Sequence, residues 1–267
     1  MSAPQPATTR PGALRREAAR LGAAVEFLTR LPVPSTGWED GRLRFALAWF
    51  PLVGLGLGAV QGGVLYLGLV ILPAPVAAGL AMAVVLWLSG ALHEDGLADT
   101  ADGLGGIGVP KERSLEIMHD SRIGTYGAVA LMIAIGLRWA ALSVLAAVPC
   151  LAVAACAVSG VLSRSAILPL VRLPFAREGG LAPMVAPPAG AALAGREGSA
   201  LVAAAVIVVA VVGALPGLLA IGAAVLAAIL VARLAMRRLG GVTGDIFGAA
   251  VVAVEVAVLV ALSGALL

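Results

Sequence analysis

Long apolar runs alternate with turn-forming or charged segments along the chain. Each run is close to the roughly 20 residues that an α-helix needs to cross the hydrocarbon core of a membrane. The runs fall near 45–71, 75–92, 125–148, 151–171, 199–214, 216–236 and 246–267. The pattern predicts an all-α fold, a polytopic integral membrane helical bundle with about seven transmembrane helices in one membrane domain at 45–267.

The breaks between these runs are of two kinds, which alternate. Uncharged turns lie at Pro73 and Pro75, at Pro149, and from Gly213 to Gly217. Charged segments lie at 1–44, 93–124, 172–198 and 233–245. These segments hold 16 of the 18 Lys and Arg residues. Because positively charged loops stay in the cytoplasm, we expect the N-terminus and all four segments on the cytoplasmic side of the cell (inner) membrane.

The composition supports a membrane protein and gives no reason to expect a nucleic-acid-binding protein. Charged residues make up 12% of the chain, against about 25% in soluble domains. The positive loops account for the net charge of +3. We therefore expect the lipid bilayer as the partner of this chain, and no nucleic acid.

The segment 1–44 is expected to be a cytoplasmic N-terminal region that contains an interfacial amphipathic helix. Between residues 14 and 28, apolar side chains recur on one helical face, while the arginines lie largely elsewhere. No short apolar stretch with a small-residue cleavage site follows, so we expect this segment to be retained.

The segment HEDGLADTADGLGG, which starts at His93, holds the most informative chemistry. If it is helical, Asp95, Asp99 and Asp102 stand at i, i+4 and i+7 and project from one face. Three such carboxylates repel one another unless a cation compensates them. Carboxylate oxygens suit Mg²⁺, particularly where substrate phosphates complete its shell. We expect a Mg²⁺ site here; a solvated acidic face is the alternative.

Two later loops carry residues suited to phosphate. In LEIMHDSRIGTYG, Arg122 could clamp phosphate oxygens while Gly124 and Gly127 allow close backbone approach; an ordinary positive anchor is the alternative. In GGVTGD at 240–245, exposed backbone amides beside Thr243 could form a phosphate-binding turn. We expect both loops and the Asp motif to form one site. A simple chain reversal is the alternative for the last turn.

Some residues inside the apolar runs are unusual. Gly54, Gly58 and Gly62 recur every four residues, which favours close packing of two helices. Ionisable groups are costly in a membrane, yet Arg138, Arg164 and Glu255 lie within runs. The two arginines could line a substrate cleft or pair with the glutamate.

These loops together resemble the cobalamin synthase family, the adenosylcobinamide-GDP ribazoletransferases. The resemblance is carried, in order, by FLTRLPVP at 27–34, LHEDGLADTADG at 92–103, MHDSRIGTYG at 118–127 and GGVTGDIFGA at 240–249. It extends over more than 200 residues. The chain departs from the pattern at Glu94, where many relatives have an apolar residue.

The resemblance implies a Mg²⁺-dependent transfer between substituted phosphate groups. A hydroxyl of α-ribazole, or of its 5′-phosphate, attacks the cobinamide-side phosphorus of adenosylcobinamide-GDP and expels GMP. This would be the late step that assembles the nucleotide loop of vitamin B12. A homo-oligomer, or association with other enzymes of that assembly, is also expected.

Roles for individual residues follow from the motifs and the resemblance. The expected metal ligands are Asp95, Asp99 and Asp102. The expected catalytic set is His93, Asp95, Asp99, Asp102, Asp120 and Arg122, with either His93 or Asp120 as the proton acceptor. The expected substrate and phosphate contacts are Glu94, Gly96, Ser121, Gly124, Thr125, Thr243, Gly244, Asp245 and Arg164.

Two other functions compete with this interpretation. A CDP-alcohol phosphotransferase shares the start of the motif at Asp95, Gly96 and Ala98, but no Arg follows Ala98 and a later paired-Asp element is missing. A proton- or ion-coupled transporter would place carboxylates near mid-membrane. Here 14 of the 15 Asp and Glu residues lie in the charged segments.

Overall fold

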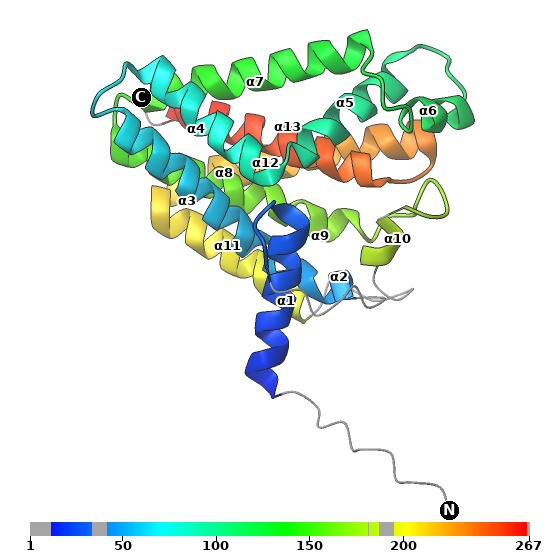
Figure 1. The fold of residues 1–267 in the computed structure, drawn as a ribbon, viewed down its shortest axis with the longest axis horizontal. Helices are drawn as coiled ribbons and strands as arrows, with labels where there is room; N and C mark the ends of the chain where they lie inside the picture. The colour runs from blue at the N-terminus through cyan, green and yellow to red at the C-terminus, as the bar shows by residue number, and fades with distance from the viewer. Residues whose placement is uncertain (1–11, 34–41, 181, 187–194, 266–267) are drawn as a thin grey trace, which may run out of the picture.

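The computed structural model describes residues 12–33, 42–180, 182–186 and 195–265, and in these ranges it is built of helices (Figure 1). The helices are α1 (Ala13–Leu28), α2 (Arg42–Ala46), the 3₁₀ turn η1 (Leu47–Trp49), α3 (Phe50–Gly68), α4 (Ala74–Ser89), α5 (Leu92–Gly105), α6 (Lys111–Ile117), α7 (Thr125–Leu145), α8 (Pro149–Ser165), α9 (Ile167–Leu170), α10 (Ala182–Val185), α11 (Arg196–Val212), α12 (Ala214–Leu239) and α13 (Gly244–Ala265). The prediction of an all-α membrane bundle is confirmed.

The number of membrane crossings differs from the expected seven. Five segments are long and apolar enough to cross a membrane: Leu43–Gly68, Thr125–Leu145, Pro149–Leu170, Ala214–Leu239 and Gly244–Ala265. The pair α4 and α5 qualifies only as one bent unit, which gives up to six. Helix α11 has 17 residues, at the short end of the crossing length. Seven crossings therefore stay a prediction.

A sharp break separates α4 from α5. Gly90 and Ala91 both adopt left-handed backbone angles, with φ of 68° and 55°, and the helices on either side are bent by 88°. A non-glycine residue in this conformation costs about 1 kcal/mol or more. The helix expected through the Asp motif is thus present, as an element separate from α4.

The glycine stripe on α3 packs as expected. A Cβ atom on Gly54 would collide with the backbone oxygen of Gly160, and one on Gly58 with that of Cys156. Both partners lie on α8, so the two helices are in backbone contact along this stripe. In a membrane the hydrophobic effect does not drive helices together, because lipid tails are as apolar as the side chains. Small residues that allow close backbone approach are therefore the usual basis of helix packing there.

Helix α1 is present over the expected residues, but it divides into two halves. Leu14 is 88% exposed, whereas Ala24 and Leu28 are buried in a core cluster with Phe50 of α3. Glu17 forms an ion pair with Arg196 at the start of α11. The C-terminal half of α1 therefore packs on the bundle; an interfacial position in a membrane stays a prediction.

Candidate active site

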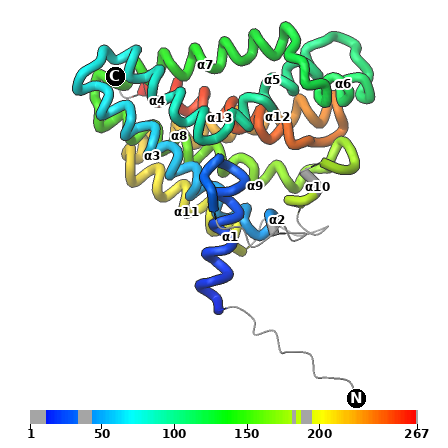
Figure 2. Tube along the Cα trace, in the orientation of Figure 1, coloured from blue at the N-terminus to red at the C-terminus, as the bar shows by residue number. Residues whose placement is uncertain are grey.

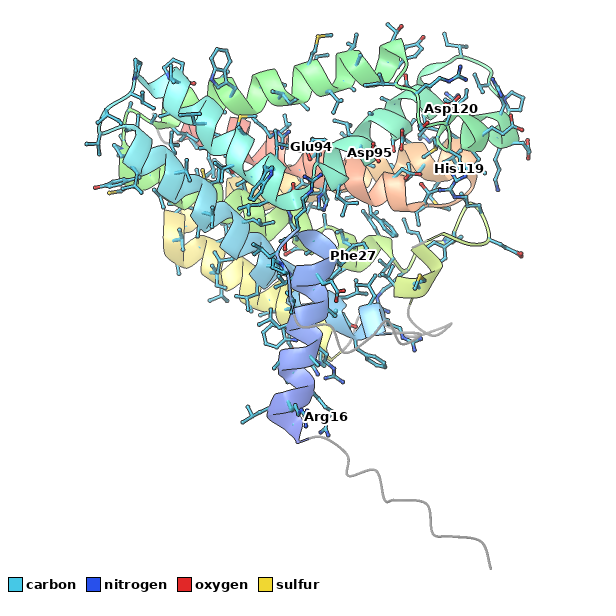
Figure 3. All side chains as sticks on the ribbon, viewed as in Figure 1. Arg16, Phe27, Glu94, Asp95, His119 and Asp120 are labelled. Carbon is cyan, nitrogen blue, oxygen red and sulfur yellow. The ribbon has the colours of Figure 1, made fainter. Side chains whose placement is uncertain are left out.

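A cavity of about 200 Å³ is lined by segments that lie far apart in the sequence. Helix α5 contributes His93 and Asp95, the turn before α13 contributes Thr243, and the first turn of α13 contributes Asp245. The loop after α9 contributes Arg177. Figure 3 shows Asp95 on α5 together with the neighbouring side chains. The Asp motif and the GGVTGD turn therefore meet here, as expected, although about 150 residues separate them.

The cavity depends on the close approach of α5 and α13, which pack side by side (Figures 1 and 2). A Cβ on Gly96 would lie 2.8 Å from the backbone oxygen of Asp245, and a Cβ on Gly248 would lie 3.0 Å from that of His93. Real Cβ atoms do not approach so closely without a shift of the neighbour. Gly96, an expected substrate contact, thus lines the cavity and also sets the helix spacing.

The third motif meets the other end of α5 through Asp102. One carboxylate oxygen of Asp102 accepts the N–H of Gly124 at 2.7 Å, and the other accepts the N–H of Gly127 at 2.8 Å. These amides lie at the start of α7, where helix N–H groups lack partners and a negative charge is favourable. Asp102 therefore caps α7, a role that the expected metal triad did not include. Thr125 opens that helix.

Asp95 and Asp99 face a second, more open hollow, which Ser121 also lines. The negative charges of Asp95, Asp245 and Asp102 repel the carboxylate of Asp99, whereas the positive charge of Arg177 attracts it. Within the described ranges, however, no group of three or more His, Cys, Asp or Glu side chains is arranged to hold a metal ion. The triad as a metal site stays a prediction.

Arg177 is a site residue that the sequence analysis did not select. Its guanidinium lies 3.5 Å from the carboxylate of Asp245, and its side chain lines the cavity. A short β-bridge anchors its loop: Ala176 N–H donates to Val242 O at 2.9 Å, and Val242 N–H donates to Pro174 O at 2.8 Å. A lone Arg in a Gly-containing loop has no diagnostic spacing. What identifies Arg177 as a site residue is its contact with Asp245, which only the structure shows.

Arg122 and Asp120, both expected catalytic residues, pair with each other. Nη2 of Arg122 lies 2.6 Å from Oδ2 of Asp120, and the Arg122 side chain is 86% exposed. Neither residue lines the two hollows described above. The hydrogen bonds from Arg122 hold the pKa of Asp120 at about 2, well below its usual value. A carboxylate with so low a pKa is a weak proton acceptor near neutral pH.

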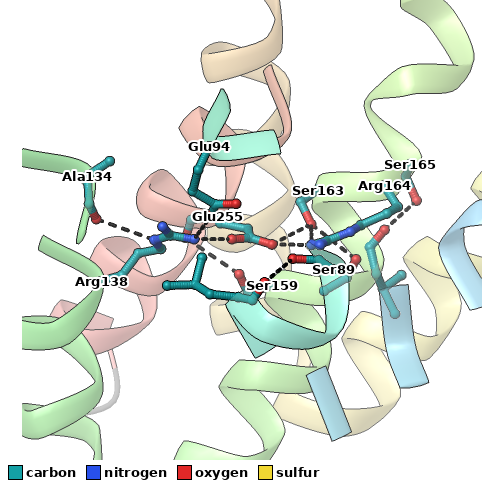
Figure 4. A network of polar contacts seen from close by, with 12 residues as sticks. Ser89, Glu94, Ala134, Arg138, Ser159, Ser163, Arg164, Ser165 and Glu255 are labelled. Atoms are coloured by element: carbon teal, nitrogen blue, oxygen red, sulfur yellow. Dashed lines mark hydrogen bonds and ion pairs between the residues drawn. The ribbon is translucent and has the colours of Figure 1, made fainter. Parts of the chain in front are cut away.

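Arg164 and Glu94, both expected to contact the substrate, belong to a buried ion network (Figure 4), and Glu94 also lines the second hollow. Arg138 of α7 lies 2.9 Å from Glu94 of α5 and 2.7 Å from Glu255 of α13. Glu255 also pairs with Arg164 of α8. The structural pair with Glu255, one of the two alternatives for the arginines, is what the structure shows. Arg164 is buried and lines neither hollow, so its role as a phosphate contact stays a prediction that this arrangement does not support.

His93 is the expected catalytic residue with the least satisfied side chain. It is buried, and its Nδ1 atom has no hydrogen-bond partner within the described part of the chain. The turn opposite is ordered by its own side chains, because the Thr243 hydroxyl lies 3.1 Å from Oδ2 of Asp245. Gly244 completes this side of the cavity.

Comparison with known protein families identifies the family to which the chain belongs. The family model described as cobalamin-5-phosphate synthase matches residues 20–263. The chain belongs to this family. All four sequence motifs lie within the matched residues, so the resemblance inferred from them is confirmed.

Named relatives agree with the family. An adenosylcobinamide-GDP ribazoletransferase of Ralstonia pickettii is 48% identical over 136 residues, which cover 50% of this chain and 53% of the relative. One of Rhizobium johnstonii is 43% identical over 191 residues, 69% of this chain and 73% of the relative. The match to the first of these spans only about half its length. No solved structure matches the chain.

Proposed function

We propose that the chain acts as an adenosylcobinamide-GDP ribazoletransferase, the activity for which its relatives are named. A hydroxyl of α-ribazole, or of its 5′-phosphate, would form a bond to the cobinamide-side phosphorus. The bond from that phosphorus to GMP would break, and the hydroxyl proton would pass to a base. The products are adenosylcobalamin, or its 5′-phosphate, and GMP.

The observation that carries the proposal is the meeting of acidic, basic and backbone groups at one cavity. Asp95 and Asp245 bring carboxylates from α5 and α13, and Arg177 brings a cation within 3.5 Å of Asp245. Transfer of a substituted phosphate depends mainly on positioning and on stabilising negative charge. Arg177 is the side chain best placed for the second task, because its planar fork suits phosphate oxygens.

Carboxylates at the cavity are suitable ligands for Mg²⁺, but they are not the same three that the sequence predicted. Asp102 is engaged by two backbone N–H groups. The carboxylate of Asp245, in contrast, lies close enough to repel the carboxylates of Asp95 and Asp99. We therefore propose Asp95, Asp99 and Asp245 as carboxylates that would contribute to binding the ion, with substrate phosphate oxygens completing its shell, because no three side chains in the described ranges are arranged to hold it by themselves. When bound, Mg²⁺ would neutralise phosphate charge.

For the proton acceptor, the geometry favours His93 over Asp120. His93 lines the cavity beside Asp95, and its buried Nδ1 atom has no hydrogen-bond partner among the residues that the structure describes. Asp120 is held by Arg122 outside the cavity. His93 would accept the proton of the attacking hydroxyl at Nδ1, if the substrate is bound at this wall of the cavity.

The same proposal places the site on the cytoplasmic side of the inner membrane. The motif loops lie in the segments that hold 16 of the 18 Lys and Arg residues, and loops rich in Lys and Arg stay in the cytoplasm. Association into homo-oligomers, or with other enzymes of the same assembly, stays an expectation.

The direct test is GMP release by purified protein from adenosylcobinamide-GDP plus α-ribazole, with and without Mg²⁺. The Asp95→Asn variant should fold but release GMP more slowly by about a hundredfold or more. Glu112→Gln, which removes an exposed charge on α6, is the matched control and should keep wild-type activity. A CDP-alcohol phosphotransferase would instead release CMP from a CDP-alcohol. Wild-type protein that releases no GMP would contradict the proposal.

A further inference from the structure

The lining of the cavity divides into two chemical parts. His93, Asp95, Arg177, Thr243 and Asp245 supply polar groups, and the remaining wall is largely apolar and aromatic. Pockets that are mostly apolar with a few placed polar groups are typical of small-molecule sites. A ligand that matches both parts carries a flat apolar group beside a polar or charged one.

Three phenylalanines, Phe27, Phe50 and Phe247, line the cavity, and two of them are stacked. The rings of Phe27 on α1 and Phe50 on α3 are stacked, with centroids 5.7 Å apart and planes 15° apart. Phe50 is 1% exposed and belongs to the core cluster, so it is a fixed support. Phe27 is only partly buried and lies in Figure 3 at the end of α1 nearest to α5. It also lines the second hollow. Its ring is therefore available to a ligand.

We propose that this apolar wall binds the base of the acceptor nucleoside, an uncharged bicyclic aromatic of the benzimidazole type. The inference rests on the proposed function, because ribazole is a benzimidazole nucleoside. Its flat base can pack on Phe27, since aromatic side chains stack on any base through its face. Its ribose then points to the polar part, where Asp95 and His93 lie.

The alternative occupant, the guanine of the donor, fits this wall poorly. Guanine carries several hydrogen-bond donors and acceptors on its edges, and burying them without partners is unfavourable. The side chains of Phe27, Phe50, Ile167, Val185 and Phe247 offer no such partners, although all five line the cavity. A dimethylbenzimidazole base has methyl groups at its outer edge and needs none.

The test compares substrate dependence in Phe27 variants. Phe27→Leu keeps an apolar side chain but removes the ring, and it should raise the KM for α-ribazole by about tenfold. The KM for adenosylcobinamide-GDP should stay at the wild-type value. Phe27→Tyr keeps the ring face and should restore the KM for α-ribazole. Phe45→Leu removes an exposed ring outside the cavity and should change neither constant.

Binding without turnover separates this inference from the proposed function. Calorimetry of α-ribazole with the wild-type protein in nanodiscs, without donor, should show binding that Phe27→Leu weakens by about tenfold. Guanosine should not compete. Competition by guanosine, or a Phe27→Leu effect on the donor KM alone, would overturn the assignment. If the wild type binds α-ribazole but releases no GMP, the base site stands and the proposed reaction falls.

Discussion

Asp95 and Asp102 lie on the same helix but have different partners. Asp95 faces the cavity, whereas Asp102 receives two backbone N–H groups of α7. An Asn at position 102 offers one acceptor oxygen, so one of these N–H groups loses its partner. We expect Asp102→Asn to lower the free energy of unfolding by about 1–2 kcal/mol. Asp95→Asn should not.

Thermal denaturation in detergent measures this difference. The two variants remove the same charge from one face of α5, about two turns apart, so each is the control for the other. An unchanged midpoint for Asp102→Asn would show that the cap at the start of α7 is not needed for stability.

Arg177 allows a second prediction for a single side chain. Arg177→Met removes the cation beside Asp245 but keeps the length of the side chain. Hydrogen bonds to charged groups contribute about 1.5–3 kcal/mol, so kcat/KM should fall about tenfold to a hundredfold. Arg113→Met, which removes an exposed arginine of α6, serves as the control in the GMP-release assay. Equal activities of both variants would remove Arg177 from the site.

Sequence reasoning could place the motifs but not every partner. The meeting of the Asp motif with Thr243 and Asp245 was predictable, because charged loops of a membrane bundle share one face. The cap formed by Asp102 was not, since the spacing i, i+4, i+7 is the same for a metal ligand and for a helix cap. The left-handed Ala91 was equally hidden, because alanine normally favours a continuous helix.

At the scale of helices, the buried ion network fixes α5 against its neighbours. Arg138 is shared by Glu94 and Glu255, which lie on α5 and α13. Arg138→Met would leave both carboxylates with less compensation, and such a loss is destabilising by about 3–5 kcal/mol. Glu94→Leu should lower the free energy of unfolding by less, because Arg138 still forms its ion pair with Glu255. The yield and melting temperature of the two variants in detergent test this order, and the reverse order would contradict it.

The contact between α3 and α8 gives another prediction at this scale. Gly58→Val places a side chain against the backbone of Cys156, whereas Gly56→Val meets open space. Overpacking costs about 1–3 kcal/mol or more, so only the first variant should lose folded protein. Size-exclusion profiles of both variants in one detergent make the comparison. Loss of folded protein in both would point to helix propensity rather than to packing.

For the whole molecule, the charge pattern restricts how many times the chain crosses the membrane. The segments 1–44 and 93–124 both carry Lys and Arg residues, seven and three of them, and the long span Leu43–Gly68 lies between them. It is these residues, not net charge, that keep a segment in the cytoplasm. Two segments on one side require an even number of crossings between them. Helix α4, although only 16 residues long, must then cross without α5. Its 16 residues rise about 24 Å, which a bilayer accommodates by local thinning.

The same parity argument applies to α11. The segments 172–198 and 233–245 are positively charged, and α12 crosses between them. Helix α11 must therefore supply the second crossing and put the turn at Gly213 outside the cell. In a background without Cys150 and Cys156, Leu215→Cys should react with an impermeant maleimide in intact cells. Gly108→Cys, in the loop after α5, should react only after permeabilisation. Both sites are exposed, so accessibility within the protein does not limit either reaction. If Leu215→Cys is labelled only after permeabilisation, α11 does not cross, and either the seven-span topology or the cytoplasmic position of the loop that carries Arg177 is wrong.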